Sequence, residues 1–453
     1  MVRSEGHLVA HLLRRAGFGV GAEELATYTA LGFEGAVDKL INFEQVDDSD
    51  LEKNLLAMRE ANPISTHPEF PEWGNREVEV AVWLARMLST KRPLQEKMSL
   101  FWHGHFCSSV PGVHSSNLIC RQNELFRNNA LTPNVKELTK LVARDPAMLV
   151  YLDNRTNMKG RPNENWAREL IELFTLGIGS YSENDVKEAA RAFTGWQLSS
   201  LRLSKDVQFF FNSKQHDEGQ KTFLGVSGNL NGDDIIEIIF KQPAHPKFIV
   251  RKLFRFFVYD NPEEATITRF ADIYTKSGFN IKELVRQLLL SSEFRSDRAY
   301  KTLIKSPLEY VIGVLRTLSA RVYDVQVWKT FNWALEAMGQ VVYDPPNVAG
   351  WAGGTTWINS STYLSRANFA KTAVNIASGM TIDPGETAIT RRLLIPDAAI
   401  DYFADLLVQD SATPYYKKTL HQMIYAQPGA QPYKAKMRML VHTIMSSPAY
   451  QMN

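Results

Sequence analysis

Apolar residues recur every three to four positions along most of this chain, a spacing that places them on one face of an α-helix. The pattern predicts helices from about Ser4 to Gly17, from Ala22 to Leu31, from Phe33 to Asn42 and from Arg76 to Thr90. Glycine readily adopts the left-handed conformation that follows a helix, so Gly17 and Gly19 are expected to end the first one. We therefore predict a mainly α fold, a large bundle-like module of many helices.

Later helices are marked by residues that satisfy the free N–H groups of a first helical turn. The segment "SPLE" at Ser306–Glu309 supplies a Ser N-cap, a Pro at the first helical position and a Glu at the third, a complete capping box. "SEND" at Ser182–Asp185 is a weaker version with Asp in place of Glu, and Asn280 precedes an apolar helix in the same manner. Each segment predicts a helix start.

Three segments depart from the helical pattern. Asp206–Gly225 is rich in Phe around a polar turn, which predicts one small β-hairpin or flap. Asn62–Gly74 and Gly339–Asn359 are rich in proline and glycine and are expected to be loops. Tyr343, Trp351 and Trp357 are aromatic anchors, so we expect the second loop to be ordered.

Composition is that of an ordinary globular protein and excludes some partners. The 453 residues are 44% hydrophobic and 22% charged, with a net charge of +2. So small a charge provides no field toward nucleic acid, and no apolar run reaches the roughly 20 residues of a membrane span. We expect neither partner. The first residues predict an amphipathic helix rather than a signal peptide, and the compartment is left open.

Two cysteines, Cys107 and Cys120, are too few for a disulfide scaffold. A single bridge would still be possible in an oxidising compartment. We favour two free, partly buried thiols.

The stretch "FWHGHF" contains two histidines one residue apart. On a regular helix His105 falls within about 80° of the apolar residues Leu94, Met98 and Trp102, whereas His103 lies nearly opposite. The two imidazoles can converge on one metal only if Gly104 ends the helix. Two interpretations stay open: a core His105 beside an exposed or interfacial His103, or a shared metal or catalytic role.

The segment Asp145–Trp196 is the richest in polar residues. Its middle predicts a helix from Asn163 to Leu176, closed by Gly177, with Arg168 and Glu172 forming an ordinary i,i+4 pair. The apolar face of this helix consists of Ala167, Leu170, Ile171 and Phe174, and its polar face of Asn165, Arg168, Glu169 and Glu172.

A return helix from Asp185 is expected to bring Glu188 and Arg191 near that polar face. The preceding loop adds further amides and carboxylates: Asp153, Asn154, Asn157, Asn163, Glu164 and Asn165. One interpretation is a salt-bridge and capping network that holds a loop on a helix hairpin. The other is a polar cleft for acid–base chemistry or for a hard cation.

"QHDEGQKTFLG" adds His216, Asp217 and Lys221. Neighbouring residues of a strand point to opposite faces, so His216 and Asp217 do not form a dyad. An Asx turn at Asp217, followed by Gly219, is the favoured interpretation.

Together these segments resemble a bacterial family, the domain of unknown function 1800. The resemblance rests on "HLLRRAGFG", "FWHGHF", "YLDN", "PNENWARELIELFTLGIGSYSENDVKEAARAFTGW", "HDEGQKTFLG", "KSPLEYVIGVLRTL" and "MGQVVYDPPNVAGWAGGTTWIN", in this order. It implies one long module over 1–453 and brings no assigned activity. Members are often exported and encoded beside a sulfatase-like family, which implies a sulfatase-like partner.

The family motifs map onto many polar residues of this chain, which favours a real site. They are His103, His105, Asp153, Asn154, Glu164, Asn165, Arg168, Glu169, Glu172, Asp185, Glu188, Arg191, Trp196, His216, Asp217, Lys221 and Trp351.

The leading hypothesis is an enzyme, a hydrolase or lyase acting on a glycan. The expected catalytic residues are Glu169, Glu172, Glu164, Asp153, Arg168 and Arg191. The expected substrate-binding residues are Asn154, Asn165, Trp196, His216, Asp217, Lys221, Trp351 and Trp357. The first alternative is a metal-dependent enzyme that binds a divalent metal through His103 and His105. The second is a non-catalytic binding or assembly module for a polysaccharide or protein. A subdivision into 1–200, 201–360 and 361–453 also fits the pattern.

Overall fold

The helices predicted at the start of the chain are present. A computed structural model describes residues 3–62, 76–200, 203, 206–375, 378–425 and 432–453. The first five helices are α1 (Glu5–Arg15), α2 (Ala22–Thr29), α3 (Gly32–Ile41), α4 (Ser49–Ala61) and α5 (Arg76–Ser89). Ser4 caps α1, and Gly19 has a φ of +94°. The predicted loop Asn62–Gly74 lies, beyond its first residue, outside the described residues.

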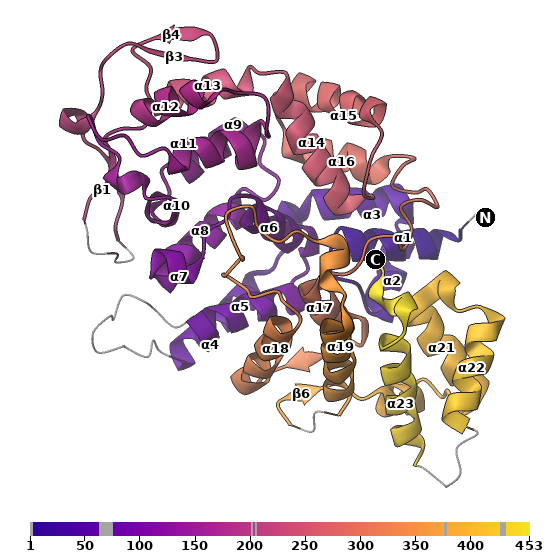
Figure 1. Ribbon diagram of the computed structural model, residues 1–453. Coiled ribbons are helices and arrows are strands. Elements are labelled where there is room, and N and C mark those ends of the chain that lie inside the picture. Colours follow the sequence, from indigo (N-terminus) through magenta and orange to yellow (C-terminus); the bar gives the residue numbers. More distant parts are fainter. Residues whose placement is uncertain (1–2, 63–75, 201–202, 204–205, 376–377, 426–431) are drawn as a thin grey trace.

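The described residues form 23 α-helices and three small β-ribbons, which confirms a mainly α fold (Figure 1). The middle helices are α6 (Pro93–His105), α7 (Val110–Val113), α8 (Ser116–Asn128), α9 (Val135–Ala143), α10 (Pro146–Tyr151), α11 (Asn165–Glu169), α12 (Glu183–Ala192), α13 (Gly232–Phe240), α14 (Ala244–Phe257), α15 (Glu264–Lys276) and α16 (Ile281–Leu290). The last helices are α17 (Pro307–Thr317), α18 (Val325–Ala337), α19 (Ser360–Ala373), α20 (Pro384–Thr390), α21 (Pro396–Val408), α22 (Pro414–Tyr425) and α23 (Tyr433–Met445). Short helical turns are η1 (Phe43–Gln45), η3 (Asn154–Thr156), η4 (Leu170–Thr175), η5 (Ser213–Gln215), η6 (Gly354–Trp357), η7 (Gln409–Ser411) and η8 (Pro448–Gln451).

All three predicted helix starts are capped as expected. The Ser306 side chain accepts from the Glu309 N–H, and the Glu309 carboxylate accepts from the Ser306 N–H. Ser182 and Asp185 form the same reciprocal pair at α12, so Asp is sufficient there. Asn280 accepts from the backbone at the start of α16. These caps depend on neighbours within three residues, which is why the sequence reveals them.

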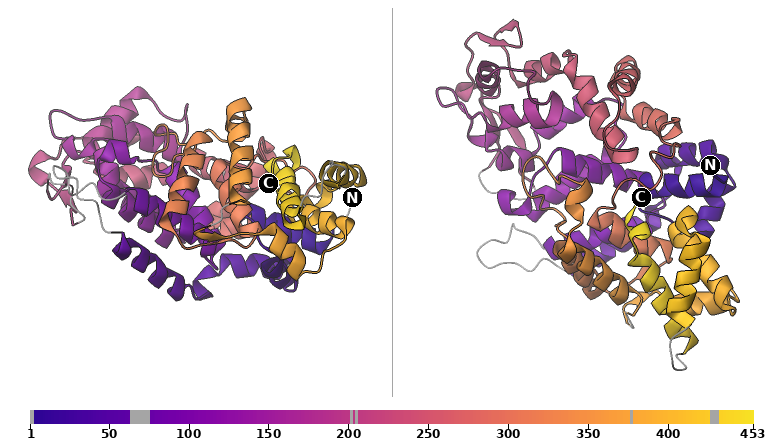
Figure 2. Two further views of the ribbon diagram at one scale, coloured as in Figure 1. Left: turned by 90° about the horizontal axis from the view of Figure 1, so that it is seen from below. Right: turned by 45° about the vertical axis from the view of Figure 1, so that its right-hand side comes forward.

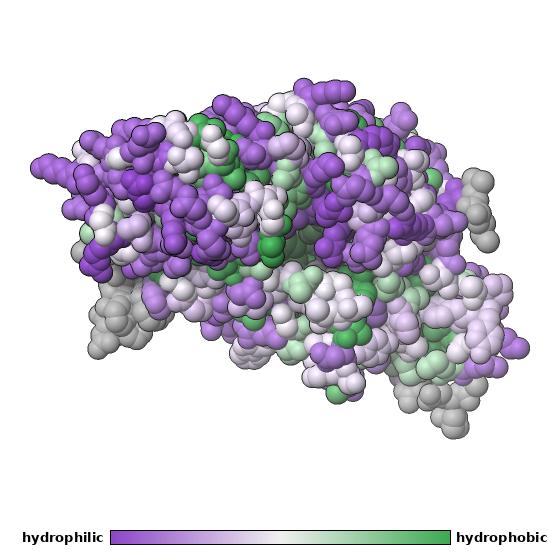
Figure 3. Space-filling view, turned by 45° about the horizontal axis from the view of Figure 1, so that its top comes forward, coloured by the Kyte–Doolittle hydropathy of each residue, from purple (hydrophilic) through white to green (hydrophobic). Residues whose placement is uncertain are grey.

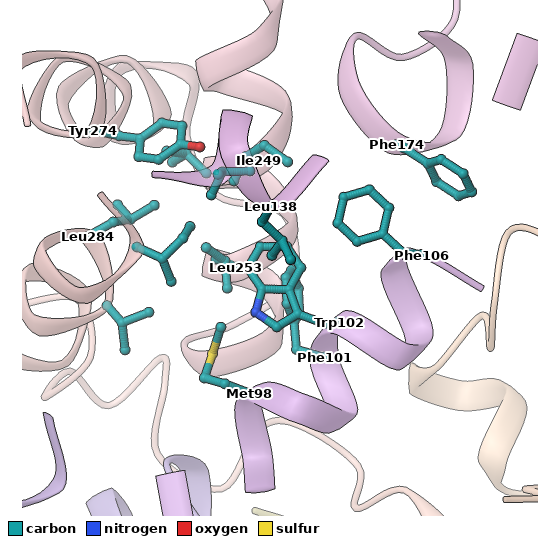
Figure 4. Close-up of a cluster of buried hydrophobic side chains, with 14 of the residues drawn as sticks. Met98, Phe101, Trp102, Phe106, Leu138, Phe174, Ile249, Leu253, Tyr274 and Leu284 are labelled. Carbon is teal, nitrogen blue, oxygen red and sulfur yellow. The ribbon is translucent and has the colours of Figure 1, made fainter. Parts of the chain in front are cut away.

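Two hydrophobic clusters hold the helices together. The first runs from Val9 to Ala299 and joins α1 and α3 with α6 and α9–α16. Trp102 lies in this cluster near Leu138 and Leu253 (Figure 4). The second runs from Phe18 to Tyr450 and joins α5 with α17–α23. Each cluster combines distant parts of the sequence, and the subdivision at 200 and 360 stays a prediction.

The molecule is broad and shallow, with β3–β4 and α21–α23 at opposite ends (Figure 2). The β structure expected near 206–225 is divided between two antiparallel ribbons. β2 (Phe209–Phe211) pairs with β1 (Trp196–Leu198), and β3 (Lys221–Phe223) pairs with β4 (Val226–Gly228). A third ribbon joins β5 (Arg321–Val322) to β6 (Met380–Thr381). The small β structure expected in this segment is therefore confirmed, and its two strands pair with β1 and β4 rather than with each other.

The loop Gly339–Asn359 lies against the end of α6. A Cβ on Gly350, whose φ is +81°, would lie 2.4 Å from the Gly104 carbonyl oxygen. The Val110 N–H donates to the Tyr343 carbonyl at 3.0 Å. Apart from the short turn η6, no helix or strand forms within these residues. The predicted ordered loop is confirmed, and it brings its aromatic residues to "FWHGHF".

None of the described helices is both long enough and apolar enough to span a membrane. Both cysteines are free thiols, with Cys107 buried and Cys120 half-buried.

Candidate active site around Tyr151

The helix that carries Glu169 and Glu172 is not a regular α-helix. It starts as α11 and continues as the π-helix η4 over Leu170–Thr175. The Thr175 hydroxyl donates to the Leu170 carbonyl at 2.5 Å, and the Lys252 ammonium donates to the Leu173 carbonyl at 3.1 Å. These side chains occupy carbonyl groups that the wider turn leaves free. Single π-turns of this kind occur frequently at functional sites.

The predicted pair between Arg168 and Glu172 is wrong. Arg168 instead binds Glu164 at 3.0 Å and Glu183 at 2.8 Å, and all three side chains are substantially exposed. Glu172 accepts a hydrogen bond from the Tyr181 hydroxyl. The wider turn after Glu169 changes the direction of the residues that follow, which regular i,i+4 spacing does not anticipate. Arg168 and Glu164 therefore form a surface network rather than part of a cleft.

Glu169 and a carboxylate from a distant segment, Asp344, both act electrostatically on the phenol of Tyr151. Tyr151 ends α10 and is half-buried. Burial raises the pKa of Tyr151, the Cys107 thiol raises it further, a hydrogen bond with Ser109 lowers it, and the Asp344 and Glu169 carboxylates both raise it. Two carboxylates thus act on one phenol, one from α11 and one from the 339–359 loop. We call Tyr151, Ser109, Glu169, Asp344 and Trp351 the Tyr151 site.

Both carboxylates of the Tyr151 site are half-buried. Burial raises the pKa of Glu169, and the neighbouring Glu172 raises it further, against the effect of Arg168. Burial also raises the pKa of Asp344, against the effect of Arg76. Among the described residues neither carboxylate has a hydrogen-bond or ion-pair partner. Carboxylates in this state are the ones that can exchange protons with a bound molecule.

Aromatic packing fixes Asp344 and Trp351. Tyr343, the residue before Asp344, has a φ of +62°, a conformation that costs free energy in a bulky residue. Its ring stacks on Trp83 at 5.0 Å and lies 5.7 Å from the His103 ring. His103 also lies 5.6 Å from Trp351, whose side chain is half-buried. This packing holds a strained backbone in place beside the carboxylate.

The two histidines face opposite sides of α6, so the shared metal site is not formed. His103 is 1% exposed among aromatic rings, its Nε2 has no partner among the described residues, and burial lowers its pKa to about 4. His105 Nδ1 accepts from Lys252 Nζ at 3.1 Å, and burial lowers the pKa of Lys252 to about 8. Within the described parts of the chain, no three His, Cys, Asp or Glu residues gather to hold a metal. His105 is a core histidine, as one interpretation expected, whereas His103 is not exposed but buried beneath Tyr343 and Trp351 of the 339–359 loop.

Arg191 belongs to a separate network that attaches the β3 loop to α12. Its guanidinium binds Asp217 at 2.8 Å and Glu188 at 2.9 Å, and its Nη1 donates to the Gln220 carbonyl at 3.2 Å. The hydrogen bond with Arg191 lowers the pKa of Asp217 to about 2. Asp217 also accepts from the Gly219 N–H at 2.8 Å, which confirms the Asx turn. We call Arg191, Asp217, Glu188 and Lys221 the hairpin anchor.

Lys221 and His216 serve the same loop. Lys221 is 1% exposed and donates to the carbonyls of Asp217 and Gly219. His216 Nδ1 donates to the Thr194 carbonyl at 2.9 Å. The three residues of "QHDEGQKTFLG" predicted to bind substrate, His216, Asp217 and Lys221, thus all have partners within their own part of the fold.

The other predicted residues are also held by their neighbours. Asp153, with a φ of +55°, accepts from Thr156 and Asn163. Asn154 accepts from Asn157 at 3.0 Å. The Asn165 N–H donates to Asn163 while its side chain is exposed.

Two of the three predicted tryptophans are buried. Trp196 is 3% exposed and packs on Phe193 and Phe209, and Trp357 is 8% exposed. Of the three, Trp351 offers the most ring surface.

Sequence reasoning missed four residues at or near the site: Tyr151, Asp344, Ser109 and Lys252. Tyr151 and Asp344 lie inside the quoted motifs "YLDN" and "VVYDPPNV", so their position in those motifs was a usable signal. Lys252 lies on α14 outside every motif, and only the fold brings it to His105.

The face viewed in Figure 3 is hollowed near its middle, where hydrophobic surface borders the recess.

A groove of about 1150 Å³ lies away from the Tyr151 site, between α2, α20 and α21. It is lined by charged and aromatic residues that include Glu23, Arg321, Arg391, Tyr402 and Arg438. None of the residues predicted for the site lines it.

Comparison with known proteins identifies a family and no activity. A family model described as "Protein of unknown function (DUF1800)" matches residues 11–452. No curated protein and no solved structure matches the chain.

Proposed function

Because the chain belongs to the DUF1800 family, whose function is not assigned, we propose an activity from the Tyr151 site itself: hydrolysis of a glycan. Glu169 and Asp344 are the acid and base, Tyr151 lies beside them, and Trp351 supports a sugar ring. This keeps Glu169 from the expected catalytic residues and takes Asp344 as the second carboxyl group, in place of Glu164 or Asp153.

One observation carries the proposal. Glu169 and Asp344 come from distant segments, have no partner among the described residues, and both act on the Tyr151 phenol. Glycoside hydrolysis requires two carboxyl groups of this kind, one protonated and one ionised. Burial raises the pKa of both Glu169 and Asp344, the direction that a general acid requires.

The proposed step is balanced by these two groups. The protonated carboxyl donates its proton to the glycosidic oxygen as the bond from that oxygen to the anomeric carbon breaks. The ionised carboxylate takes a proton from the water whose oxygen bonds to the anomeric carbon. The products are two shorter sugars, and the two carboxyl groups have exchanged protonation states.

The aromatic surroundings support a sugar as the substrate class. Trp351 lies on the same loop as Asp344. Its side chain is half-buried and lies against the His103 ring of α6. Sites for small molecules combine such apolar surfaces with few polar groups. The family resemblance also implies a sulfatase-like partner, so sulfated polysaccharides belong among the substrates to be tested.

The test is an assay of new reducing ends over a panel of bacterial, plant and sulfated polysaccharides. Glu169→Gln and Asp344→Asn should each abolish release while melting at the wild-type temperature. Glu164→Gln is the matched control, because it changes a carboxylate on the same helix end that binds Arg168 at the surface. It should retain full activity.

A non-catalytic binding module is the second candidate, and the satisfied network of the hairpin anchor favours it. Binding of a polysaccharide that requires Trp351, with no bond cleaved in the whole panel, would contradict the hydrolase and support this module. Products with an unsaturated sugar would instead indicate a lyase.

A further inference from the structure

A small cavity lies where four distant segments meet, far in sequence from the Tyr151 site. Its volume is about 20 Å³. It forms between α1, the segment before α17, η7 and η8, and Figure 1 shows the C-terminal end of the chain beside α1. Its polar lining is Arg14, Thr317, Lys305, Gln409, Tyr450 and Asn453.

Two buried basic side chains face this cavity. Arg14 is 8% exposed and donates through Nη1 to the Gln409 side-chain oxygen, but its Nε and Nη2 have no partner among the described residues. Lys305 is 4% exposed and donates to the Tyr450 carbonyl at 2.7 Å. Neither cation forms an ion pair with a described carboxylate. A buried charge without a counter-charge destabilises the fold unless another group neutralises it.

The surrounding groups include further basic side chains. Arg15, Lys301 and Arg366 lie in the same region and bind the carbonyl oxygens of Ala299, Val408 and Lys305. The half-buried carboxylate of Glu309 is already paired with Lys97. Carbonyl oxygens satisfy N–H groups but supply no net negative charge. Burial and the nearby Arg14 lower the pKa of Lys305 well below its ordinary value, and burial lowers that of Lys301 to about 6. Arg14 is therefore the charge that lacks a close counter-charge, and a bound anion would also stabilise the charged form of Lys305.

We propose that this cavity binds one small monovalent anion, of the chloride class, between Arg14 and Lys305. Its volume suffices for a single particle of about the size of a water molecule. A water would accept the free Arg14 N–H groups but would leave the charge uncompensated, whereas an anion does both. The bound ion connects α1 to the C-terminal segments and therefore stabilises their contact.

Bromide gives the direct test, because it replaces chloride and scatters anomalously. Crystals of the whole chain transferred to sodium bromide should show an anomalous peak between Arg14 and Lys305. A cavity that contains only water, with bromide ordered elsewhere on the surface, would overturn the proposal.

Melting in solution gives an independent test on the same protein. At constant ionic strength, replacing gluconate by chloride should raise Tm by about 1–2 °C per tenfold increase in chloride, because a ligand of the native state stabilises logarithmically. A Tm that does not depend on chloride would also overturn the anion site.

Variants locate the effect. Arg14→Gln and Lys305→Met should each abolish the dependence on chloride. Lys140→Met is the control: it removes a surface cation that binds Glu237, and this variant should keep the chloride dependence of Tm. If the chloride dependence persisted in a folded Arg14→Gln protein, the ion would bind elsewhere and the assignment would be wrong. If neither variant folds, the wild-type bromide and chloride results decide alone.

Discussion

The hairpin anchor and the Tyr151 site look alike in sequence and differ in structure. Both are built from family motifs rich in carboxylates and aromatic residues. In the hairpin anchor, Arg191 binds Asp217 and Glu188, and Lys221 donates to backbone carbonyls. At the Tyr151 site, Glu169 and Asp344 have no such partner among the described residues. The difference shows that polar motif residues can serve either folding or chemistry, and that their partners decide which.

The pKa directions support the same distinction. The hydrogen bond with Arg191 lowers the pKa of Asp217 to about 2, which makes it a permanent anion near neutral pH. Burial raises the pKa of Glu169 and of Asp344, which brings them closer to exchanging protons at that pH. A carboxylate that is fully paired stabilises the fold, whereas one held without a partner is available to a substrate.

The largest expected effect is on activity at the Tyr151 site. Removing an acid–base group typically costs about a hundredfold to ten-thousandfold in rate. Glu169→Gln and Asp344→Asn should lose at least that much in kcat. Because neither carboxylate stabilises a partner, the free energy of unfolding should change by less than about 0.5 kcal/mol. Kinetics measure the rate and urea denaturation measures the free energy of unfolding. A large loss of stability without a loss of rate would show that these carboxylates support the fold and are not catalytic.

The next effect is acid sensitivity from His103. Burial lowers its pKa to about 4, whereas in the unfolded chain it titrates near 6.5. Between these values the unfolded state binds more protons, so stability falls as the pH drops from about 6.5 to about 4, by about 3 kcal/mol for this residue. His103→Phe should reduce that loss. Unfolding free energy as a function of pH checks this, and an unchanged slope would contradict it.

A smaller effect is expected at the hairpin anchor. Asp217→Ala removes the Arg191 pair and the acceptor of the Asx turn, and should cost about 2 kcal/mol. The folded pKa of Asp217 lies below the unfolded one, so its contribution is present above about pH 4 and is lost as the pH falls toward about 2. Activity of the folded variant should be retained. A catalytic role for Asp217 would show itself as a rate loss at unchanged stability.

The smallest effect is expected at Arg168. Its pairs with Glu164 and Glu183 are exposed, and such pairs contribute about 0–1 kcal/mol. Arg168→Gln should therefore leave both stability and rate nearly unchanged. Comparing the Tm of wild type and variant in low and in high salt would measure the part of the stability that salt screens. A clear loss of rate would return Arg168 to the site.

Much of the fold was predictable because it depends on near neighbours. The caps at Ser182, Asn280 and Ser306 and the Asx turn at Asp217 involve residues at most three positions apart. The apolar face shared by α11 and η4 follows from helical spacing alone. The π-helix at Leu170 was not predictable in this way, since its free carbonyl groups are satisfied partly by Lys252 from α14.

The sequence by itself determined that the chain is a helical module of its family, where many of its helices begin, and which segments contain polar residues in unusual density. Only the tertiary structure decided how those residues are divided. Arg191 pairs with Asp217, whereas the loop that lies against α6 places Asp344 where it acts on Tyr151. The physical reason is that local hydrogen bonds depend on neighbours in sequence, whereas burial, long-range pairing and the pKa of a carboxylate depend on what the rest of the chain packs around it.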